Sequence, residues 1–420
     1  MTLLQDLRWR GLIYDIINEE GLEKRLQEGP ISLYCGFDPT ADSLHIGSLL
    51  PIVTLLRFKQ YGNKIVALTG GGTGLIGDPS GKKNERGMNT VETVKSWAEK
   101  FKKQMDIFFH FNDEDTFFID NSKWLCELKA IDMWRDYGKH FNINLMLQKD
   151  SVKSRLDSGG LTYLEFSYMV MQSIDFLTLY EDKKIHCEMQ IGGQDQWGNI
   201  TAGMDLIRKV KGSDAITFAL TMPLILKNDG TKYGKTESGA VWLDKNKTSP
   251  YEMYQFFVNT ADSDVMQLIK YYTFLSHDEI NDLELRMKNK PHLREAQKVL
   301  ASEVVAMVHG KKALEQALRV TEALFSGDVK DLTKEDILMG FKGLKEIEVS
   351  ENLNVIDALV MLNLASSKRE AREFLKNNAI MINGEYESDF DFEIKKENAL
   401  DQTYSVLRRG KKKYAIIKHI

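Results

Sequence analysis

Residues 34–48 have the sequence YCGFDPTADSLHIGS, and they contain the transition that decides the fold. Apolar side chains alternate from Ile31 to Cys35, as in a buried strand, and the alternation stops at Pro39. A helix-like pattern begins near Leu44. The stretch therefore predicts a strand, a turn and a helix N-terminus, where backbone N–H groups and the helix dipole favour a phosphate group.

Two short strings supply candidate phosphate-binding groups. In the first, residues 45–48 (HIGS), Gly47 would let a nucleotide lie close to the backbone, and His45 and Thr40 would donate to phosphate oxygens. Taken alone, this histidine is more simply explained as a helix-start residue held by local hydrogen bonds. The second string, residues 232–236 (KYGKT), lies far downstream and adds two lysines. The order, separation and flanks of the two strings make a joint chance match improbable.

Strand-like runs alternate with amphipathic stretches, such as residues 91–109 and 161–180, in the first half of the chain. The alternation predicts an α/β fold, a Rossmann-like parallel sheet wrapped by helices, with ligands beyond the carboxyl ends of the strands. The predicted strands are residues 31–37, 64–69, 116–120, 185–191 and 215–220. The loops expected to meet at that edge are residues 38–43, 70–81, 121–124 and 192–198.

Residues 72–77 (GTGLIG) raise the alternative of a nicotinamide enzyme, because they match the dinucleotide pattern GxGxxG and follow a strand. The helix that this pattern requires is broken at once by residues 78–81 (DPSG). A phosphate-binding P-loop also fails, because Ile76 and Asp229 stand where the two candidate strings need their first glycine. Both alternatives are therefore disfavoured.

The helical stretch from residue 161 to 180 bears on the substrate. Thr162 and Glu165 predict a capping box at its start. Tyr168, Gln172 and Asp175 then fall on one polar stripe of an otherwise apolar helix. Buried polar groups need partners. A water-linked core network and a small zwitterionic ligand with a polar side chain both satisfy this requirement.

The bulk composition is that of a globular protein, with 43% hydrophobic and 28% charged residues in 420. The length predicts two to four domains, roughly. The chain has no apolar run long enough for a membrane span, and its start lacks the features of a signal peptide, so we expect a cytoplasmic protein. Its three cysteines form no Cys-x-x-Cys pair, which argues against a structural zinc site. The net charge of −5 does not indicate a polyanion partner, although residues 404–420 are basic and could be either a solvated tail or an RNA-contacting edge.

With these motifs the chain resembles the bacterial tyrosyl-tRNA synthetases, which are class I aminoacyl-tRNA synthetases, over essentially its whole length. The resemblance identifies the two short strings as ATP-handling motifs. It is carried by residues 34–48, 70–86, 168–175, 190–199 and 232–236.

The resemblance implies three groups of site residues. Tyr34 and Asp175 would hold the tyrosine hydroxyl, and the whole tyrosine-binding set is Tyr34, Asp78, Tyr168, Gln172, Asp175 and Gln196. The implied ATP-binding set is Cys35, Gly36, Asp38, Gly47, Ser48, Gly192, Asp195, Lys235 and Thr236. The catalytic set that would stabilise charge on the leaving pyrophosphate is Thr40, His45, Lys82, Arg86, Lys232 and Lys235.

The implied reaction has two steps and needs no protein nucleophile. Tyrosine and ATP give tyrosyl-adenylate and pyrophosphate, and the tyrosyl group then moves to the 3′ end of tRNA(Tyr). Magnesium is expected with the ATP phosphates, although the sequence shows no dedicated cation cage. We also expect the Gly- and Lys-rich segments 80–87 and 227–235 to close over ATP. Ser48 stands where the first motif commonly has a second histidine, so altered nucleotide affinity is expected.

The second half predicts an α-helical module, a linker with glycines among charges, and a segment that resembles the S4 RNA-binding fold. For that last segment alone, a helical hairpin with a solvated basic face is an open alternative. The predicted RNA-binding residues are Lys368, Arg369, Arg372, Arg408 and Arg409. The predicted domains are residues 1–225 (catalytic), 226–245 (ATP-site loop), 246–330 (α-helical, tRNA-binding), 331–350 (linker) and 351–420 (S4-like).

Two other functions remain open. A tryptophanyl-tRNA synthetase would share the scaffold, but Tyr34 and Asp175 suit a phenol, and an S4-like segment is not expected there. A non-catalytic RNA-binding protein on the same frame would not need His45, Asp78 or the lysines of the second motif. The resemblance further implies a homodimer, which the residue pattern itself does not indicate.

Overall fold

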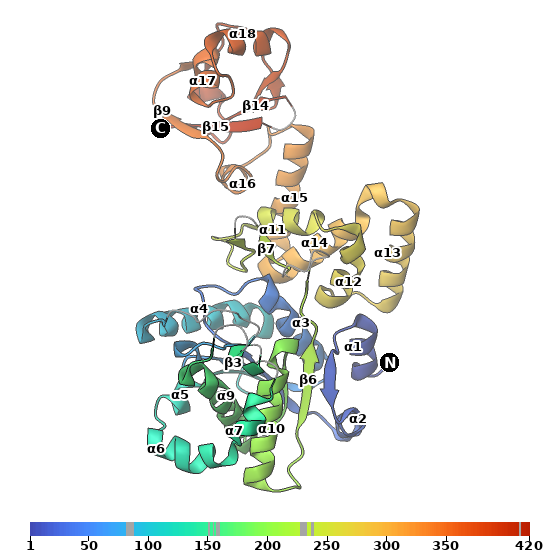
Figure 1. Ribbon diagram of the computed structural model, residues 1–420. Coiled ribbons are helices and arrows are strands. Elements are labelled where there is room, and N and C mark those ends of the chain that lie inside the picture. Colours follow the sequence, from blue (N-terminus) through green and yellow to red (C-terminus); the bar gives the residue numbers. More distant parts are fainter. Residues whose placement is uncertain are drawn as a thin grey trace. The chain divides into compact units, whose positions relative to one another are not determined.

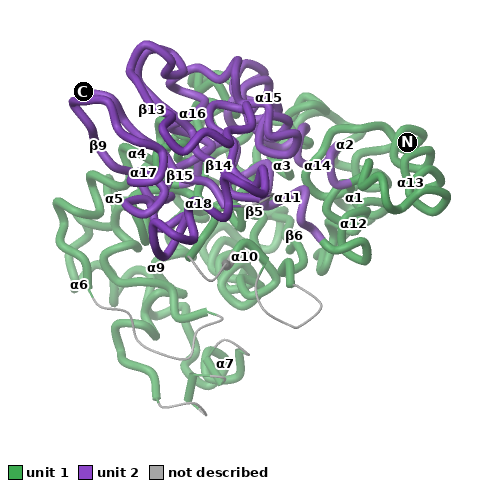
Figure 2. Tube along the Cα trace, turned by 90° about the horizontal axis from the view of Figure 1, so that it is seen from above, with its two compact units in different colours: residues 1–247, 261–296 green, residues 248–260, 297–420 purple. Residues whose placement is uncertain are grey.

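The computed structural model describes residues 1–80, 88–149, 152–153, 155–156, 160–226, 233–236, 239–410 and 413–420, with the backbone alone for residues 235–236. The chain forms two compact units, coloured separately in Figure 2. Unit 1 contains residues 1–247 and 261–296. Unit 2 contains residues 248–260 and 297–420.

A mixed sheet forms the centre of unit 1 (Figure 1). Its described strands follow the order β1-β6-β5-β2-β3-β4, in which β1 is antiparallel to β6 and the other neighbours are parallel. This confirms the predicted Rossmann-like α/β class. The antiparallel edge strand β1 is not predicted, because so short a strand shows no alternation. The strands are β1 (Asp15–Ile17), β2 (Ser32–Phe37), β3 (Lys64–Thr69), β4 (Thr116–Asp120), β5 (Cys187–Gly193) and β6 (Phe218–Met222).

Helices α3 (Ile46–Gln60) and α4 (Val91–Phe109) pack against strands β2, β3 and β4, while α9 (Tyr163–Glu181) and α10 (Trp197–Lys211) pack against each other and β5 (Figure 1). The predicted capping box of α9 is present, since Thr162 accepts from the N–H of Glu165 and the Glu165 side chain accepts from the N–H of Thr162. The other α-helices that lie wholly in unit 1 are α1 (Leu3–Arg10), α2 (Glu19–Glu28), α5 (Ser122–Leu125), α6 (Ala130–Asp132), α7 (Ile143–Leu147), α12 (Asp262–Tyr272) and α13 (His277–Asn289).

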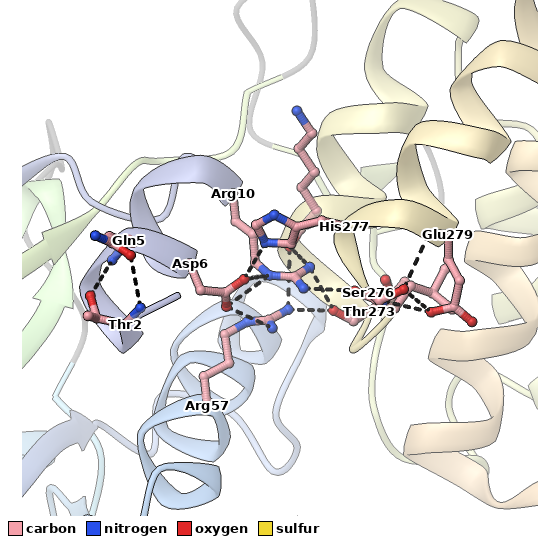
Figure 3. Close-up of polar contacts among 11 residues, drawn as sticks. Thr2, Gln5, Asp6, Arg10, Arg57, Thr273, Ser276, His277 and Glu279 are labelled. Atoms are coloured by element: carbon pink, nitrogen blue, oxygen red, sulfur yellow. Dashed lines mark hydrogen bonds and ion pairs between the residues drawn. The ribbon is translucent and has the colours of Figure 1, made fainter.

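A buried ionic cluster joins α1 to α12 and α13 within unit 1 (Figure 3). Asp6 accepts from Arg10 Nε at 2.9 Å and lies 2.8 Å from His277 Nε2, and Arg57 Nη1 lies 3.7 Å from the second carboxylate oxygen. Burial by itself would raise the pKa of Asp6, but these partners lower it below its usual range. The ionised carboxylate therefore links α1, α3 and α13 at one point, and Arg10 Nη1 extends the cluster to α12 by donating to the Lys270 carbonyl at 3.3 Å.

Unit 2 combines helices with a C-terminal sheet in the strand order β12-β11-β14-β15-β9. The segment predicted as a linker, residues 331–350, contains helix α16 and strand β9, because Ile337 and Phe341 are apolar at helical spacing and are buried. The α-helices are α11 (Pro250–Val258), α14 (Glu295–His309, which begins in unit 1), α15 (Lys311–Ser326), α16 (Lys334–Gly340), α17 (Val355–Met361) and α18 (Lys368–Lys376). The sheet strands are β9 (Glu346–Val349), β11 (Ile380–Ile382), β12 (Glu385–Tyr386), β14 (Tyr404–Arg409) and β15 (Lys413–His419).

Within the described parts of both units, no helix is long and apolar enough to cross a membrane.

Candidate active site

A cavity of about 250 Å³ lies at the carboxyl ends of the parallel strands in unit 1. Strands β2, β3 and β5 reach it through residues 34–36, Leu68 and residues 190–193. Parallel α/β sheets bind ligands at this edge, because loops from neighbouring strands meet there. The other lining residues, from loops, α3, α9 and the turn before α10, are Asp38, Thr40, Pro51, Gly70, Thr73, Asp78, Asn121, Tyr168, Gln172, Asp175 and Gln196.

Asp175 is buried in the cavity wall and already has two hydrogen-bond donors. Asn121 Nδ2 donates to Oδ2 at 2.9 Å, and Trp124 Nε1 donates to Oδ1 at 2.8 Å. Both donors come from the segment after β4, which sheet topology brings beside α9. Burial raises the pKa of Asp175 to about 7, although the two hydrogen bonds oppose the shift. A ligand group that donates to this carboxyl would favour its ionised form.

Two polar atoms of the cavity wall are buried without a hydrogen-bond partner in the described parts of the chain. They are the hydroxyl of Tyr34 in β2 and Oε1 of Gln190 in β5. Tyr34 is 0% exposed and Gln190 is 2% exposed. An unpaired buried group costs roughly 1–3 kcal/mol, and native proteins keep few of them. The cavity therefore fits a ligand that brings its own polar groups, one of which can pair with a phenol hydroxyl.

The polar stripe predicted on α9 faces this cavity. Tyr168, Gln172 and Asp175 all line it. Tyr168 Oη donates to Asp38 Oδ2 at 2.7 Å, and Thr73 Oγ1 donates to Asp38 Oδ1 at 2.8 Å. The stripe thus has buried protein partners and also lines the cavity.

Asn199 on α10 connects the groups at another part of the wall. Its Nδ2 lies 3.0 Å from Gln172 Oε1 and 3.2 Å from Gln196 Oε1. Gln196 Nε2 in turn donates to Asp78 Oδ2 at 2.6 Å. Gln172, Gln196 and Asp78, which belong to the tyrosine-binding set that the resemblance implies, are therefore joined with Asn199 in one hydrogen-bonded group.

His45 is the N-cap of α3. Its Nδ1 accepts from the N–H of Gly47 at 3.0 Å, so the neutral ring carries its proton on Nε2. This is the local hydrogen bond that the simpler explanation requires, and it also gives the ring the donor form that a phosphate oxygen needs. The ring lies edge-on to Trp242, with 6.3 Å between the centroids. Thr40 lines the cavity, whereas His45, Gly47 and Ser48 are not among its lining residues.

The other predicted ATP-site residues fall into two groups. Cys35, Gly36 and Gly192 line the cavity, and Asp195 lies in the turn beside Gly193. Burial raises the pKa of the Cys35 thiol to about 12, which keeps it neutral. Outside the described residues lie Lys82, Arg86 and Lys232, together with the side chains of Lys235 and Thr236.

The glycine-rich loop after β3 serves the packing of this site. A Cβ on Gly70 would clash with Asp38 and Thr73, and one on Gly71 would clash with Asp120. The loop forms a 3-10 helix over residues 73–75 and, in the described chain, the next α-helix is α4. No helix of the dinucleotide-binding type begins in residues 70–80, the described part of this loop, as predicted.

Five side chains of the site have no role predicted from the sequence. A polar residue inside an otherwise buried strand was the available signal for Gln190 in β5. The others lie within segments that the sequence singled out, but their contacts depend on long-range topology. The five are Thr73, Asn121, Trp124, Gln190 and Asn199.

The predicted RNA-binding residues of unit 2 fall into two groups, those exposed on α18 and those bonded within the fold on β14. Lys368, Arg369 and Arg372 are exposed on α18, and the Arg369 side chain is 91% exposed. On β14, by contrast, Arg409 Nη1 donates to the Leu364 carbonyl at 2.6 Å, and its guanidinium lies 4.7 Å from the centre of the Phe374 ring. Arg408 similarly lies over Tyr414 and donates to Met381 Sδ.

Comparison with known proteins gives consistent matches. The family described as tRNA synthetases class I (W and Y) matches residues 26–326, and the Tyrosine–tRNA ligase SYY-like C-terminal domain matches residues 336–417. The chain is 52% identical over 420 residues to tyrosine–tRNA ligase 1 of Bacillus subtilis (strain 168), with 99% of each chain covered. It is 51% identical over 422 residues to tyrosine–tRNA ligase of Geobacillus stearothermophilus, with 100% of each covered. A solved C-terminally truncated mitochondrial tyrosyl-tRNA synthetase of Aspergillus nidulans superposes with a TM-score of 0.69 at 30% identity, covering 77% of this chain and 94% of that one.

Proposed function

Because the chain belongs to the class I tRNA synthetases (W and Y), and its full-length relatives are tyrosine–tRNA ligases, we propose that it activates L-tyrosine with ATP and charges tRNA(Tyr). A tyrosine carboxylate oxygen attacks the α-phosphate, the bond to pyrophosphate breaks, and tyrosyl-adenylate forms. A hydroxyl of the 3′-terminal ribose then attacks the tyrosyl carbonyl, and AMP leaves.

The observation that carries the choice of tyrosine is the unpaired, buried hydroxyl of Tyr34 beside Asp175 in one cavity. A phenol hydroxyl of the substrate would donate to Asp175 and accept from Tyr34. Phenylalanine would leave the Tyr34 hydroxyl without a partner in the described chain and would bring Asp175 no donor beyond Asn121 and Trp124. Tyrosyl-tRNA synthetases are the standard example of discrimination by a site that pairs with the substrate hydroxyl. At the other end of the substrate, Asp78, Tyr168 and Gln172 would hold the ammonium group, and Gln196 would lie near the carboxylate.

The nucleotide would occupy the side formed by β2 and the turn before α10. Cys35, Gly192 and Asp195 lie there, with Asp38 between this side and α9. Catalysis of such a displacement consists mainly of positioning and of stabilising charge on the leaving pyrophosphate. We assign the stabilisation of this charge to Thr40, His45, Lys82, Arg86, Lys232 and Lys235. Further nucleotide contacts are assigned to Gly36, Gly47, Ser48 and Thr236.

Magnesium would accompany the ATP phosphates. In the described part of the chain, no group of three or more His, Cys, Asp or Glu side chains is arranged to hold a metal ion. We propose that the ion enters as its ATP complex, and that the residues named above bind the phosphate oxygens that the ion leaves accessible.

A homodimer and a cytoplasmic location complete the proposal. The dimer is supported by exposed apolar side chains from the segment after β4 to the first residue of α9: Ile131, Trp134, Ile143 and Tyr163 are each more than half exposed. Large exposed apolar patches mark interaction sites. The cytoplasm is where the tRNA substrate would be charged.

RNA recognition is assigned to unit 2. Lys368, Arg369 and Arg372 on α18 would contact tRNA phosphates, and Arg408 and Arg409 on β14 are kept in the proposed RNA-binding set. Residues 1–225 remain the proposed catalytic domain, residues 226–245 the ATP-site loop and residues 351–420 the S4-like domain. The proposed helical module, residues 246–330, is divided between the two compact units, and strand β9 of residues 331–350 pairs with β15, so this connection is part of the S4-like sheet.

The experiment that tests this function is amino-acid-dependent ATP–pyrophosphate exchange with magnesium. Tyrosine, phenylalanine and tryptophan are compared at equal concentration. Exchange with tyrosine alone is expected. Exchange with tryptophan would overturn the roles of Tyr34 and Asp175, and no exchange with any of the three, while tRNA still binds, would favour a non-catalytic RNA-binding protein.

A further inference from the structure

Ile46, the second residue of the first ATP motif, is contacted from three directions. Its N–H donates to the carbonyl of Val241 at 2.9 Å, and its carbonyl accepts from the hydroxyl of Tyr272 at 3.2 Å. Its side chain fills the space where a Cβ on Gly234, in the second motif, would have to lie. Gly234 has a φ of +87°, which also favours glycine at this position. Ile46 is therefore held on both sides of its Cα by two other segments, and its side chain is covered by the second motif.

The hydrogen bond to Val241 belongs to a short antiparallel pairing. The N–H of Leu243 donates to the Leu44 carbonyl at 2.8 Å, and residues 45 and 242 form a β-bridge. Val241 also donates from its N–H to the carbonyl of Gly234 at 3.0 Å. The first motif is thus joined through the backbone to the chain that leaves the second motif, so a displacement of one must be accommodated by the other.

Tyr272 is the last residue of α12, and it is 1% exposed. Burial raises the pKa of its hydroxyl well above the usual value, so the group stays protonated and remains a donor. The same turn of α12 holds the other end of α3, because Arg57 donates to the carbonyl of Thr273 (Figure 3) and to that of Lys270 at 3.4 Å. The C-terminal turn of α12 therefore fixes α3 at its first residue and again near its last.

We propose that Tyr272 is a positioning residue for adenylate formation, which holds the Ile46 carbonyl so that His45 and the turn of the second motif keep a fixed relation. This inference rests on the proposed function, because the two motifs matter to catalysis only if the chain uses ATP. Tyr272 is not among the residues lining the cavity where tyrosine would bind. Its loss should therefore slow the step at the α-phosphate and leave tyrosine binding unchanged.

The test compares Tyr272→Phe with Tyr271→Phe. The control removes the same hydroxyl from the neighbouring residue, whose hydroxyl interacts with Gln267 instead. Tyrosine affinity is measured by equilibrium dialysis without ATP, and the rate of adenylate formation is measured in a single turnover. For Tyr272→Phe we expect the rate to fall about 10-fold, as misplacement of reacting groups predicts, with tyrosine affinity within about two-fold of the parent; Tyr271→Phe should change neither.

Each outcome decides the inference. A Tyr272→Phe rate equal to that of the parent, or a loss of tyrosine affinity as large as the loss of rate, would overturn it. If that variant did not fold, Gly234→Ala, which displaces Ile46 from the opposite side, would be subject to the same two measurements. A parent protein that forms no adenylate with tyrosine would instead refute the proposed function and is recognised by that result before any variant is made.

Discussion

Tyr34→Phe should make the free protein more stable while it weakens selection of tyrosine. The hydroxyl of Tyr34 is fully buried and has no partner in the described chain. Burial, together with the nearby Asp175, raises its pKa well above the usual value, so it stays a neutral group that is desolvated without compensation. Removing it should raise the free energy of unfolding of unit 1 by about 1 kcal/mol, which corresponds to roughly 2 °C in the thermal midpoint of a unit of this size.

The same substitution should weaken the preference of the enzyme for tyrosine. Loss of one hydrogen bond to the tyrosine hydroxyl, about 1–1.5 kcal/mol, should reduce the preference for tyrosine over phenylalanine roughly 10-fold. Differential scanning calorimetry gives the midpoint of the unit 1 transition, and pyrophosphate exchange with both amino acids gives the preference.

The matched control is Tyr168→Phe. Its hydroxyl donates to Asp38 at 2.7 Å, so its removal should lower the midpoint instead of raising it. A lower midpoint for Tyr34→Phe as well would show that its hydroxyl is paired in solution, and an unchanged preference for tyrosine would show that it does not contact the substrate. Either result would refute the reasoning from the unpaired hydroxyl.

Three further outcomes are expected. The pKa of Asp175 is raised to about 7 in the folded chain, so its contribution to stability is complete below pH 4 and is lost as the pH rises to about 7. The free energy of unfolding should therefore fall by at most about 1.4 kcal/mol per pH unit in this range. Urea titrations from pH 5 to 8 should show a flatter dependence of the unfolding free energy on pH for Asp175→Asn than for the parent. Arg369→Ala should weaken tRNA binding and reduce the slope of log affinity against log salt by about one, whereas Arg409→Ala should mainly lower the melting midpoint of unit 2, because its guanidinium is bonded within the fold. Trp134→Glu should shift sedimentation from dimer to monomer, while an unchanged dimer would exclude that surface as the interface.

The fold was predictable from the sequence where local pattern and tertiary structure agree. Helix α4 has the predicted limits because its buried positions follow the helical period and Thr90 caps its start. The start of α9 follows from its capping box, which is formed by residues close in the chain. Strands β3 and β4 also have the predicted limits. Strand β1 and helix α16 are too short for their periodicity to be recognised.

The site was predictable only in part, because its contacts join residues far apart in sequence. The polar stripe of α9 indicates that Asp175 needs partners, but Asn121 and Trp124 reach it only because β4 is an edge strand and α9 crosses beside its end. Asn199 joins Gln172 through a similar approach of α10 to α9. The periodicity of a single segment cannot indicate contacts with a distant segment. The roles assigned to the motif residues came from the resemblance to a family.

The polar groups of the cavity differ in whether protein groups already hydrogen-bond to them. Asp175 has donors from protein groups that fix its orientation before any ligand arrives, which is what a preorganised site needs. The Tyr34 hydroxyl and Gln190 Oε1 have no such partner in the described parts of the chain. Both residues lie on strands that are paired on each side, β2 between β3 and β5 and β5 between β2 and β6, so the backbone cannot move to supply a partner. The paired strands therefore keep the Tyr34 hydroxyl unsatisfied, whereas a flexible loop would move to supply a partner. The unpaired hydroxyl lowers the stability of the free protein, and a substrate hydroxyl can pair with it on binding.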